Sequence, residues 1–539
     1  MPRIRKAAFI GALLVPVVAG GFLLQARSQR EGAELLDQVM SLVNDRYVDT
    51  LPLSDVYAKA AAGLVKELND PYSELLTPKD LKQFSSRTGG RYGGLGMLIE
   101  PEPDTKTVRV VTVYPNTPAE GGGVHEGDLI IRVDSLSTRG WTINQVSDSL
   151  TGTPGTKVKV SFARPGVAAP ITATFTRAII NVPAVPYVIT LGNKIGYIPL
   201  QQFNENAADN VQAAIKKLQD QGARAVILDM RGDPGGILEQ SLRVANTFLP
   251  QGQLLASVKG REGPMQIEMA KAAPLAPTIP LVVMTDDRTA SASEIVAGAL
   301  QDHDRALVVG QTSFGKGLVQ GVYDHLDGGY ALKLTTGKWF TPSGRSIQRP
   351  RKFVNGAFVE DTPDSNETNA TKKNRPTFKS DAGRTVYGGG GITPDVIVQD
   401  DTLTTSEQLF AKAIAPKSQD ARTVLDDYSM SLAKSASPTF TVQSAWLNEF
   451  YNRLQAKGVT VDRKTYDGAT RYVSRLLDNR VAHYAFGDSS AKRRDLPNDA
   501  PLRKAIELLD KGGTQRELFA LAGEPLSASR SVPPTARKP

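Results

Sequence analysis

The chain has 539 residues, of which 40% are hydrophobic and 22% are charged, a composition typical of a globular protein with several domains. It has no cysteine and only four histidines without an HExxH pattern, which excludes a disulfide framework, a cysteine nucleophile and the usual zinc sites. The formal net charge is +8, but no basic stripe with interleaved aromatic residues is present, so we expect no nucleic-acid binding, no metal and no cofactor.

The N-terminus carries the pattern of an export signal. Arg3, Arg5 and Lys6 precede an apolar stretch over residues 7–24. A basic segment before such a stretch predicts that the rest of the chain lies outside the cytoplasm. Residues 1–30 are therefore either a cleaved signal peptide or an anchor in the inner membrane, and the length of the stretch leaves both open. We expect an exported protein of the bacterial periplasm or cell envelope.

Residues 31–88 are predicted to be helical. Apolar residues recur at helical spacing from Leu35 to Val43 and from Val56 to Leu68, and Asn69-Asp70-Pro71 ends the second run. Such a segment is either an element for docking or dimerisation or a helical cap on the next domain. The first alternative predicts a homo-oligomer.

Short β-like runs separated by turns extend over residues 89–178. Their order resembles a PDZ domain, with Gly94, Leu95, Gly96 and Met97 at the carboxylate-binding loop. Successive N–H groups of such a loop can hold an anion, and a strand edge beside it can accept an extended peptide. A tight turn is the simpler interpretation of Gly-Leu-Gly alone. The runs that follow are strand Val108–Val113, turn and strand Gly127–Asp134, helix Ile143–Leu150 and strand Lys157–Arg164.

Strand and helix patterns alternate over residues 179–400, which predicts βαβ units on a mostly parallel sheet. The exposed, low-complexity piece Thr362–Asp381 is predicted to interrupt this domain. Residues 401–526 are predicted to be a helical domain and residues 527–539 a disordered tail. The predicted strands are Ile195–Leu200, Ala225–Met230, Leu281–Met284, Ala306–Val309 and Ala331–Thr336, and the helices are Ala207–Gln219, Pro234–Thr247 and Ser291–Gln301.

Three polar residues in this domain are candidates for catalysis. Ser291 follows a buried strand and begins a predicted helix, Lys316 lies between two glycines 25 residues later, and Gln320 follows by four. A serine needs a base to become a nucleophile, and a lysine can be that base where burial lowers its pKa. A neutral glutamine would orient the lysine without raising its pKa. Each residue also has an ordinary interpretation: a helix cap completed by Glu294, an exposed turn lysine and an exposed strand residue.

An oxyanion hole is predicted beside the serine. The Ala292 N–H at the helix start is one donor, and the second is expected from Gly235 or Gly236 in the turn after strand Ala225–Met230. A phosphate-binding turn is the alternative, but no Walker A sequence is present.

These motifs, in this order, resemble the C-terminal processing peptidases, also called tail-specific proteases. The resemblance extends over roughly residues 70–400 and includes Leu332–Thr336, Thr341–Ile347 and Gly391–Asp395. It implies an α/β and α+β multidomain protein: a PDZ domain inserted before a crotonase-like α/β serine protease core, with helical N- and C-terminal parts.

The function implied is a serine endopeptidase with a Ser-Lys-Gln acyl-enzyme mechanism, whose PDZ domain recognises the free C-termini of protein or peptide substrates. An adaptor protein is a further expected partner, and membrane anchorage is expected if the apolar stretch 7–24 is retained. Two alternatives stay open from the residues. One is a catalytically inactive PDZ adaptor or scaffold in the envelope. The other is an enoyl-CoA hydratase-like enzyme, which the export signal disfavours.

Overall fold

The computed structural model describes residues 32–102, 106–164, 167–354, 357–360, 375–523 and 526. Residues 7–24, residues 527–539 and most of the predicted insertion at 362–381 lie outside this part. Two compact units are present, one comprising Met1–Leu81 and Gln320–Thr336, the other Lys82–Val319 and Gly337–Pro539. None of the helices in the described ranges has both the length and the apolar composition needed to cross a membrane. Helix α3 (Pro78–Gly89) and strands β17 (Leu318–Tyr323) and β18 (Ala331–Phe340) each have residues in both units.

The first unit consists of helices and a short strand pair. Residues 32–46 are helical, as is α2 (Leu53–Lys66), and Asn69 in a left-handed conformation (φ 52°) follows the end of α2. Strand β1 (Glu74–Leu76) pairs with Ala331–Lys333 of β18. Several apolar side chains of these helices are exposed, among them Leu35, Leu42 and Leu64 with 64%, 61% and 69% of their surface accessible. The predicted apolar stripe is therefore present, with Met40, Val56 and Val65 buried and most of its other members exposed in the described chain.

An antiparallel sheet with two helices follows at the start of the second unit. Its strand order is β3-β4-β5-β7-β8, so β3 lies at an edge. The core is made by alternate strand residues such as Val108, Val110 and Phe162. A capping box between Thr142 and Gln145 begins helix α5. The elements are β2 (Arg91–Gly94), β3 (Met97–Glu102), β4 (Thr107–Val113), α4 (Pro118–Gly121), β5 (Leu129–Val133), β6 (Leu136–Ser137), α5 (Ile143–Leu150), β7 (Lys157–Ala163), β8 (Ile171–Thr176) and β9 (Ala178–Asn181).

The predicted parallel sheet is confirmed. Its order is β10-β11-β12-β15-β16-β23, and every neighbouring pair is parallel except β10 with β11. All residues of β12 and β15 are buried, as expected for strands covered on both faces. The strands are β10 (Ile189–Leu191), β11 (Ile195–Pro199), β12 (Ala225–Asp229), β15 (Leu281–Thr285), β16 (Leu307–Gly310) and β23 (Val396–Ile397).

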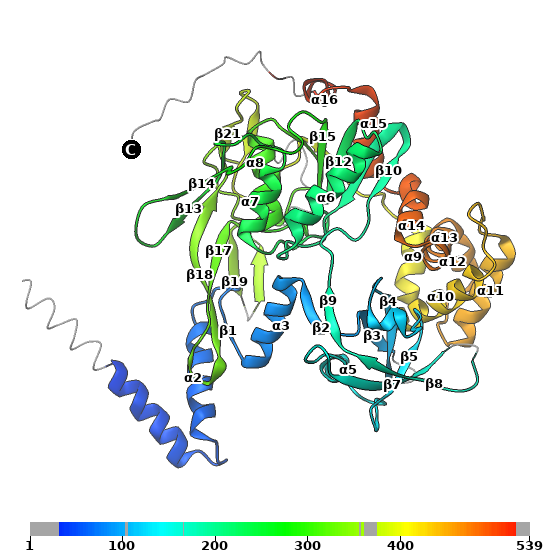
Figure 1. Cartoon of the computed structure of the whole chain (residues 1–539), viewed down its shortest axis with the longest axis horizontal. Coiled ribbons are helices and arrows are strands. Elements are labelled where there is room, and N and C mark those ends of the chain that lie inside the picture. Colours follow the sequence, from blue (N-terminus) through cyan, green and yellow to red (C-terminus); the bar gives the residue numbers. More distant parts are fainter. Residues whose placement is uncertain are drawn as a thin grey trace, which may run out of the picture. The chain divides into compact units, whose positions relative to one another are not determined.

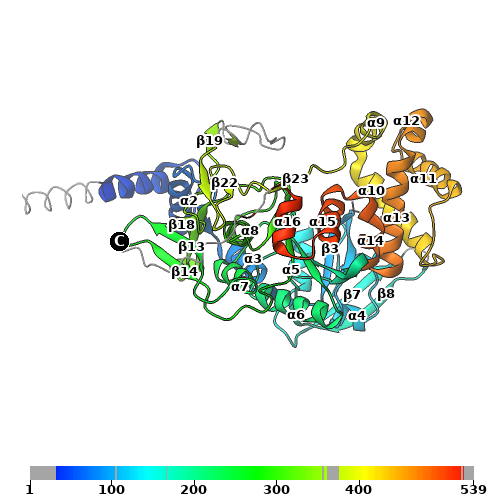
Figure 2. The ribbon, with the colours of Figure 1, turned by 90° about the horizontal axis from the view of Figure 1, so that it is seen from above.

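Helices cover both faces of this sheet (Figure 1, Figure 2). One face packs on α6 (Ala207–Asp220), α7 (Leu238–Asn246) and α8 (Ala292–Asp302), and the other packs on α15 (Ala500–Lys511) and α16 (Gln515–Leu521). Successive residues of β12 alternate between the two cores, with Val226 and Leu228 on the first and Ala225 and Ile227 on the second. The last two helices of the chain are therefore a layer of the α/β domain.

Two antiparallel strands were not predicted from the sequence. Strand β13 (Leu254–Gly260) pairs with β14 (Gln266–Met269) and with Gly337–Phe340 of β18.

The remaining helices bury a separate cluster around Phe410, Phe450 and Tyr466. The other elements are β19 (Arg351–Val354), β20 (Ala357–Glu360), β21 (Thr377–Lys379), β22 (Thr385–Tyr387), α9 (Thr405–Ile414), α10 (Ser418–Ala433), α11 (Ser444–Ala456), α12 (Arg463–Gly468), α13 (Thr470–Phe486) and α14 (Asp488–Asp495).

Candidate active site

Ser291 lies at the N-cap of helix α8, after the loop that leaves strand β15. Its backbone has φ 56° and ψ −112°, a conformation that is strained for a residue with a β-carbon. The Ser291 N–H donates to Glu294 Oε2 at 2.7 Å. The predicted capping role of Glu294 is thus present. The strained serine lies at the start of the helix, where the Ala292 N–H has no acceptor within the helix.

Glu294 joins the serine to the lysine loop. The carboxylate is fully buried, and its Oε1 accepts from Ser313 Oγ at 2.5 Å and from Gly315 N at 2.6 Å. Its Oε2 accepts from Lys316 N at 2.9 Å as well as from Ser291 N. Burial raises the pKa of Glu294, and these four donors act in the opposite direction.

A geometric bound follows for the two candidate catalytic residues. The backbone nitrogens of Ser291 and Lys316 lie 2.7 and 2.9 Å from one oxygen, so no more than 5.6 Å separates them. The Lys316 carbonyl also accepts from Trp339 Nε1 at 3.0 Å. The structure therefore brings the predicted serine and lysine into one site, and the shared carboxylate fixes both backbones.

The turn after β12 packs directly on this serine. A β-carbon on Gly235 would lie 2.6 Å from the Ala290 carbonyl oxygen and 3.0 Å from Ser291 Cβ. Gly235 and Gly236 also have φ values of 90° and 151°, which glycine adopts without strain. Because of these conformations helix α7 begins at Leu238, and not at Pro234 as the sequence predicted.

The N–H groups of Gly235 and Gly236 differ in their hydrogen bonds. The Gly235 N–H donates to Asp233 Oδ1 at 2.8 Å, so it is already used. Among the described residues, no acceptor is found for the Gly236 N–H or for the Ala292 N–H. Ala292 and Gly236 are therefore the better pair of oxyanion donors.

A second carboxylate, Asp286, ties this turn to the serine loop. Asp286 Oδ1 accepts from Gly232 N at 2.8 Å, from Thr289 N at 2.9 Å and from Arg288 N at 3.1 Å. Thr289 Oγ1 in turn donates to the Met230 carbonyl at 2.9 Å. The loops after β12 and β15 are thus held together by hydrogen bonds of the Asp286 and Thr289 side chains.

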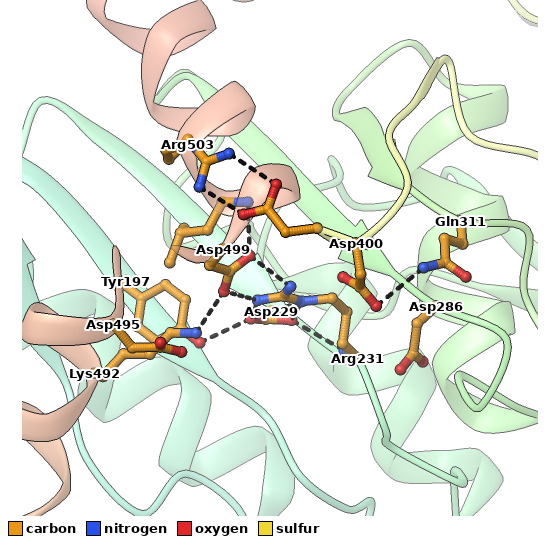
Figure 3. A network of polar contacts seen from close by, with 12 residues as sticks. Tyr197, Asp229, Arg231, Asp286, Gln311, Asp400, Lys492, Asp495, Asp499 and Arg503 are labelled. Carbon is orange, nitrogen blue, oxygen red and sulfur yellow. Dashed lines mark hydrogen bonds and ion pairs between the residues drawn. The ribbon is translucent and has the colours of Figure 1, made fainter. Parts of the chain in front are cut away.

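An ionic network from the end of the chain supports the turn from the other side (Figure 3). Arg231 forms a bidentate pair with Asp499, both distances being 2.8 Å, and also binds Asp229 at 2.7 Å. Lys492 donates to Asp499 at 2.7 Å and Tyr197 donates to Asp229 at 2.7 Å. Burial alone would raise the pKa of Asp499, but Arg231 and Lys492 hold that pKa far below its usual value.

This network lines a cavity of about 310 Å³ at the carboxyl end of β11 and β12. The sequence did not point to Asp499 or Lys492, which lie more than 250 residues after Arg231. Asp499 does have a local signal, since it caps helix α15 by accepting from the Leu502 N–H at 3.0 Å. That signal predicts a helix start and says nothing about Arg231.

Gln320 belongs to the first unit, unlike the other candidates of this site. It lies in β17, and its Nε2 donates to Thr335 Oγ1 at 3.3 Å. Phe314, two residues before Lys316, carries the Arg351 guanidinium 4.0 Å above its ring centre. The structure therefore joins Ser291 and Lys316, and it describes Gln320 only within its own unit.

The predicted carboxylate-binding loop lies between β2 and the edge strand β3. Gly94 ends β2, Leu95 is buried, Gly96 has φ 88° and Met97 begins β3. A β-carbon on Gly96 would lie 2.4 Å from the Thr117 side chain. The Leu95 and Gly96 carbonyls accept from Ala119 N and Tyr114 N, which orients the loop. β3 is an edge strand beside this loop, a position that suits the addition of a peptide strand, although Gln419 of α10 donates to its Pro101 carbonyl at 3.3 Å.

Two family models match the chain, the peptidase family S41 over residues 194–352 and the PDZ domain over residues 109–164. A carboxy-terminal-processing protease of Bartonella bacilliformis is 36% identical over 314 residues, which cover 58% of this chain and 71% of the relative. The chain belongs to peptidase family S41. The carboxyl-terminal-processing protease of Picosynechococcus sp. is 32% identical over 364 residues, covering 64% of this chain and 87% of the relative.

Among solved structures, a photosystem II D1 C-terminal processing protease is 29% identical and covers 60% of this chain and 84% of its own, with a TM-score of 0.34. The sequence matches confirm the predicted fold class and the predicted family of this S41 peptidase. They favour a peptidase over an inactive PDZ adaptor.

Proposed function

We propose that this S41 peptidase is a serine endopeptidase that cleaves protein substrates near their C-termini, with Ser291 as the nucleophile, Lys316 as the general base and Gln320 as the residue that orients the lysine. The observation that carries the proposal is the single carboxylate of Glu294, which binds the backbones of Ser291 and Lys316 together. A lysine loop fixed to the serine cap suits proton transfer between the two side chains.

The reaction then has two halves. Ser291 Oγ attacks the scissile carbonyl while Lys316 Nζ takes its proton, and the oxyanion accepts hydrogen bonds from the Ala292 and Gly236 N–H groups. The C–N bond breaks, and the lysine returns the proton to the leaving amine. Water attacks the acyl-enzyme while the lysine takes a proton from the water. The ester C–O bond then breaks, the lysine returns the proton to Ser291 Oγ, and the new carboxylate product leaves.

Substrate capture is assigned to the PDZ domain. The loop of Gly94, Leu95, Gly96 and Met97 is the proposed site for the substrate carboxylate, and the edge strand β3 is proposed to pair with the substrate backbone. Capture of a flexible tail raises its concentration near the catalytic serine.

The cellular setting is part of the same proposal. The basic residues before the apolar stretch 7–24 support export to the periplasm or cell envelope, either with a cleaved signal peptide or with a retained membrane anchor. The exposed apolar side chains Leu35, Leu42 and Leu64 support a homo-oligomer formed by the N-terminal helices. A protein adaptor is a further proposed partner.

The test is turnover of an unstructured peptide with a free C-terminus, with the products identified by mass spectrometry. Ser291→Ala and Lys316→Ala are expected to abolish cleavage, whereas Lys217→Ala, on the exposed side of α6, is the matched lysine control and retains it. Circular dichroism melting shows whether each variant is folded. Cleavage by folded Ser291→Ala at the wild-type rate overturns the proposal.

A further inference from the structure

One carboxyl group beside the candidate oxyanion hole has no use in the mechanism above. Asp233 lies in the turn between β12 and α7 and has no accessible surface. Its Oδ1 accepts from the Gly235 N–H at 2.8 Å, while its Oδ2 is buried with no hydrogen-bond partner among the described residues. A buried carboxylate without donors on one oxygen is strongly disfavoured relative to the neutral acid.

The backbone of Asp233 is bound to the serine cap. Its carbonyl oxygen accepts from Ala290 N at 3.0 Å and from Ser293 Oγ at 3.1 Å. Two residues later, Gly235 packs against Ala290 and Ser291 so closely that no β-carbon fits. Any displacement of the Asp233 side chain is therefore passed to the glycine turn and to the start of α8.

In the part of the chain that the structure describes, no cation is found paired with the Asp233 side chain. The loop after β15 presents Asp286, a carboxylate, and the Arg288 of that loop is paired with Asp286. Arg231, on the β12 side, is taken by Asp229 and Asp499. From α8, Ser293 is the polar neighbour, and Glu294 is turned to the lysine loop.

We propose that Asp233 is a positioning residue that is neutral in the active enzyme, and that its ionisation disables the oxyanion hole and sets the alkaline limit of catalysis. As a neutral acid it accepts from Gly235 N and keeps the Gly236 N–H directed at the substrate. As a carboxylate it places an unpaired negative charge beside the oxygen where the transition state also becomes negative. Burial raises the pKa of Asp233 to about 8, against the hydrogen bonds from Gly235 N and the Ser293 side chain and with a smaller contribution from Asp286, which places the change within the working range of an enzyme.

This inference rests on the proposed function, and the experiment separates the two. The full chain is assayed from pH 5 to pH 10 with a neutral, blocked-side-chain peptide whose own groups do not titrate in this range. For the wild type we expect kcat/KM to fall above about pH 8 with a slope approaching tenfold per pH unit. Asp233→Asn keeps the acceptor for Gly235 N and cannot ionise. The fall of kcat/KM at high pH, which is the descending limb of the pH profile, is therefore expected to disappear in this variant.

The matched control is Asp287→Asn in the neighbouring loop, where the side chain is exposed, and its descending limb should match the wild type. Asp233→Ser, which also offers a neutral acceptor, replaces Asp233→Asn if that variant does not fold. A purely structural role would lower activity at every pH and leave the limb in place.

A second readout does not depend on activity. Since the folded protein holds a proton on Asp233 that the unfolded chain loses near pH 4, the wild type should lose thermal stability as the pH rises from about 4 to about 8. The melting temperature of Asp233→Asn minus that of the wild type should therefore increase over this range and then level off. A wild-type profile without a descending limb, or the same limb in the neutral variants, overturns the inference. Loss of cleavage in Ser291→Ala with an unchanged limb in Asp233→Asn overturns this inference alone and leaves the proposed function standing.

Discussion

The shared carboxylate of Glu294 can be tested by a change of one atom. Glu294→Gln replaces one oxygen of a fully buried group that accepts four hydrogen bonds. An amide NH2 on the Oε2 side would face two backbone N–H groups, those of Ser291 and Lys316. On the Oε1 side it would face Ser313 Oγ, which can accept, and the Gly315 N–H, which cannot. In either orientation at least one loop amide loses its acceptor.

The magnitude follows from these contacts. A hydrogen bond to a charged group contributes about 1.5–3 kcal/mol, and a buried donor left unpaired costs about 1–3 kcal/mol. We therefore expect the free energy of unfolding to fall by roughly 2–4 kcal/mol in Glu294→Gln. A lysine loop that moves by about 1 Å would lower kcat/KM on the order of 100-fold. The effect should be mainly on kcat, since the PDZ loop that captures the substrate is untouched.

The assay pairs urea denaturation with steady-state kinetics on a peptide substrate. The matched control is Glu239→Gln, in the first turn of the neighbouring helix α7, where the carboxylate is 55% exposed and lies 3.7 Å from Lys271. An exposed pair of this kind contributes less than about 1 kcal/mol. Wild-type stability and wild-type kcat in Glu294→Gln would show that the carboxylate does not hold the two loops.

Two further changes test the surroundings of the serine. Asp499→Asn removes the charge that Arg231 and Lys492 share, while Arg231 keeps Asp229, so we expect a loss of about 1.5–3 kcal/mol at pH 7. The loss should shrink below about pH 4, because the low pKa of Asp499 stabilises the folded state only above that range. Urea denaturation against pH measures it, with the more exposed Asp510→Asn as control, and a loss equal to that of the control contradicts it. Gly235→Ala places a β-carbon 2.6 Å from the Ala290 carbonyl oxygen, at a residue whose φ of 90° disfavours a side chain. Steady-state kinetics should show kcat lower by roughly 100-fold or more. Unchanged kinetics in a folded variant would refute the packing of the glycine turn on the serine.

The sequence alone predicted the features that are local in the chain. Buried parallel strands appear as short apolar runs, and Ala225–Met230 and Leu281–Met284 were recognised in this way. Ser291 was recognised because a capping serine, small neighbours and Glu294 follow a strand. Strands β13 and β14 were missed, since an antiparallel pair of mixed polarity has no comparable run.

Contacts between distant segments could not be predicted in the same way. Helix α15 was expected as a helix from its periodicity, but periodicity gives the apolar face and not the surface it covers. Its packing on the second face of the parallel sheet, and the approach of Asp499 to Arg231, depend on the path of the chain over the intervening residues. A helix cap such as Asp499 has the same local sequence whether or not an arginine lies opposite.

The carboxylates around Ser291 have a common physical origin. The site is built from loops at the ends of parallel strands, and loop N–H groups have no partner strand or helix to accept them. Asp286 accepts three backbone N–H groups, Glu294 accepts three and a hydroxyl, and Asp233 accepts one. Among the described residues no acceptor is found for the Ala292 and Gly236 N–H groups, which are the donors that we propose for a substrate oxyanion. In the proposed oxyanion hole the acidic residues accept from neighbouring N–H groups and hold the loops in place, so they matter to its shape as the glycines do.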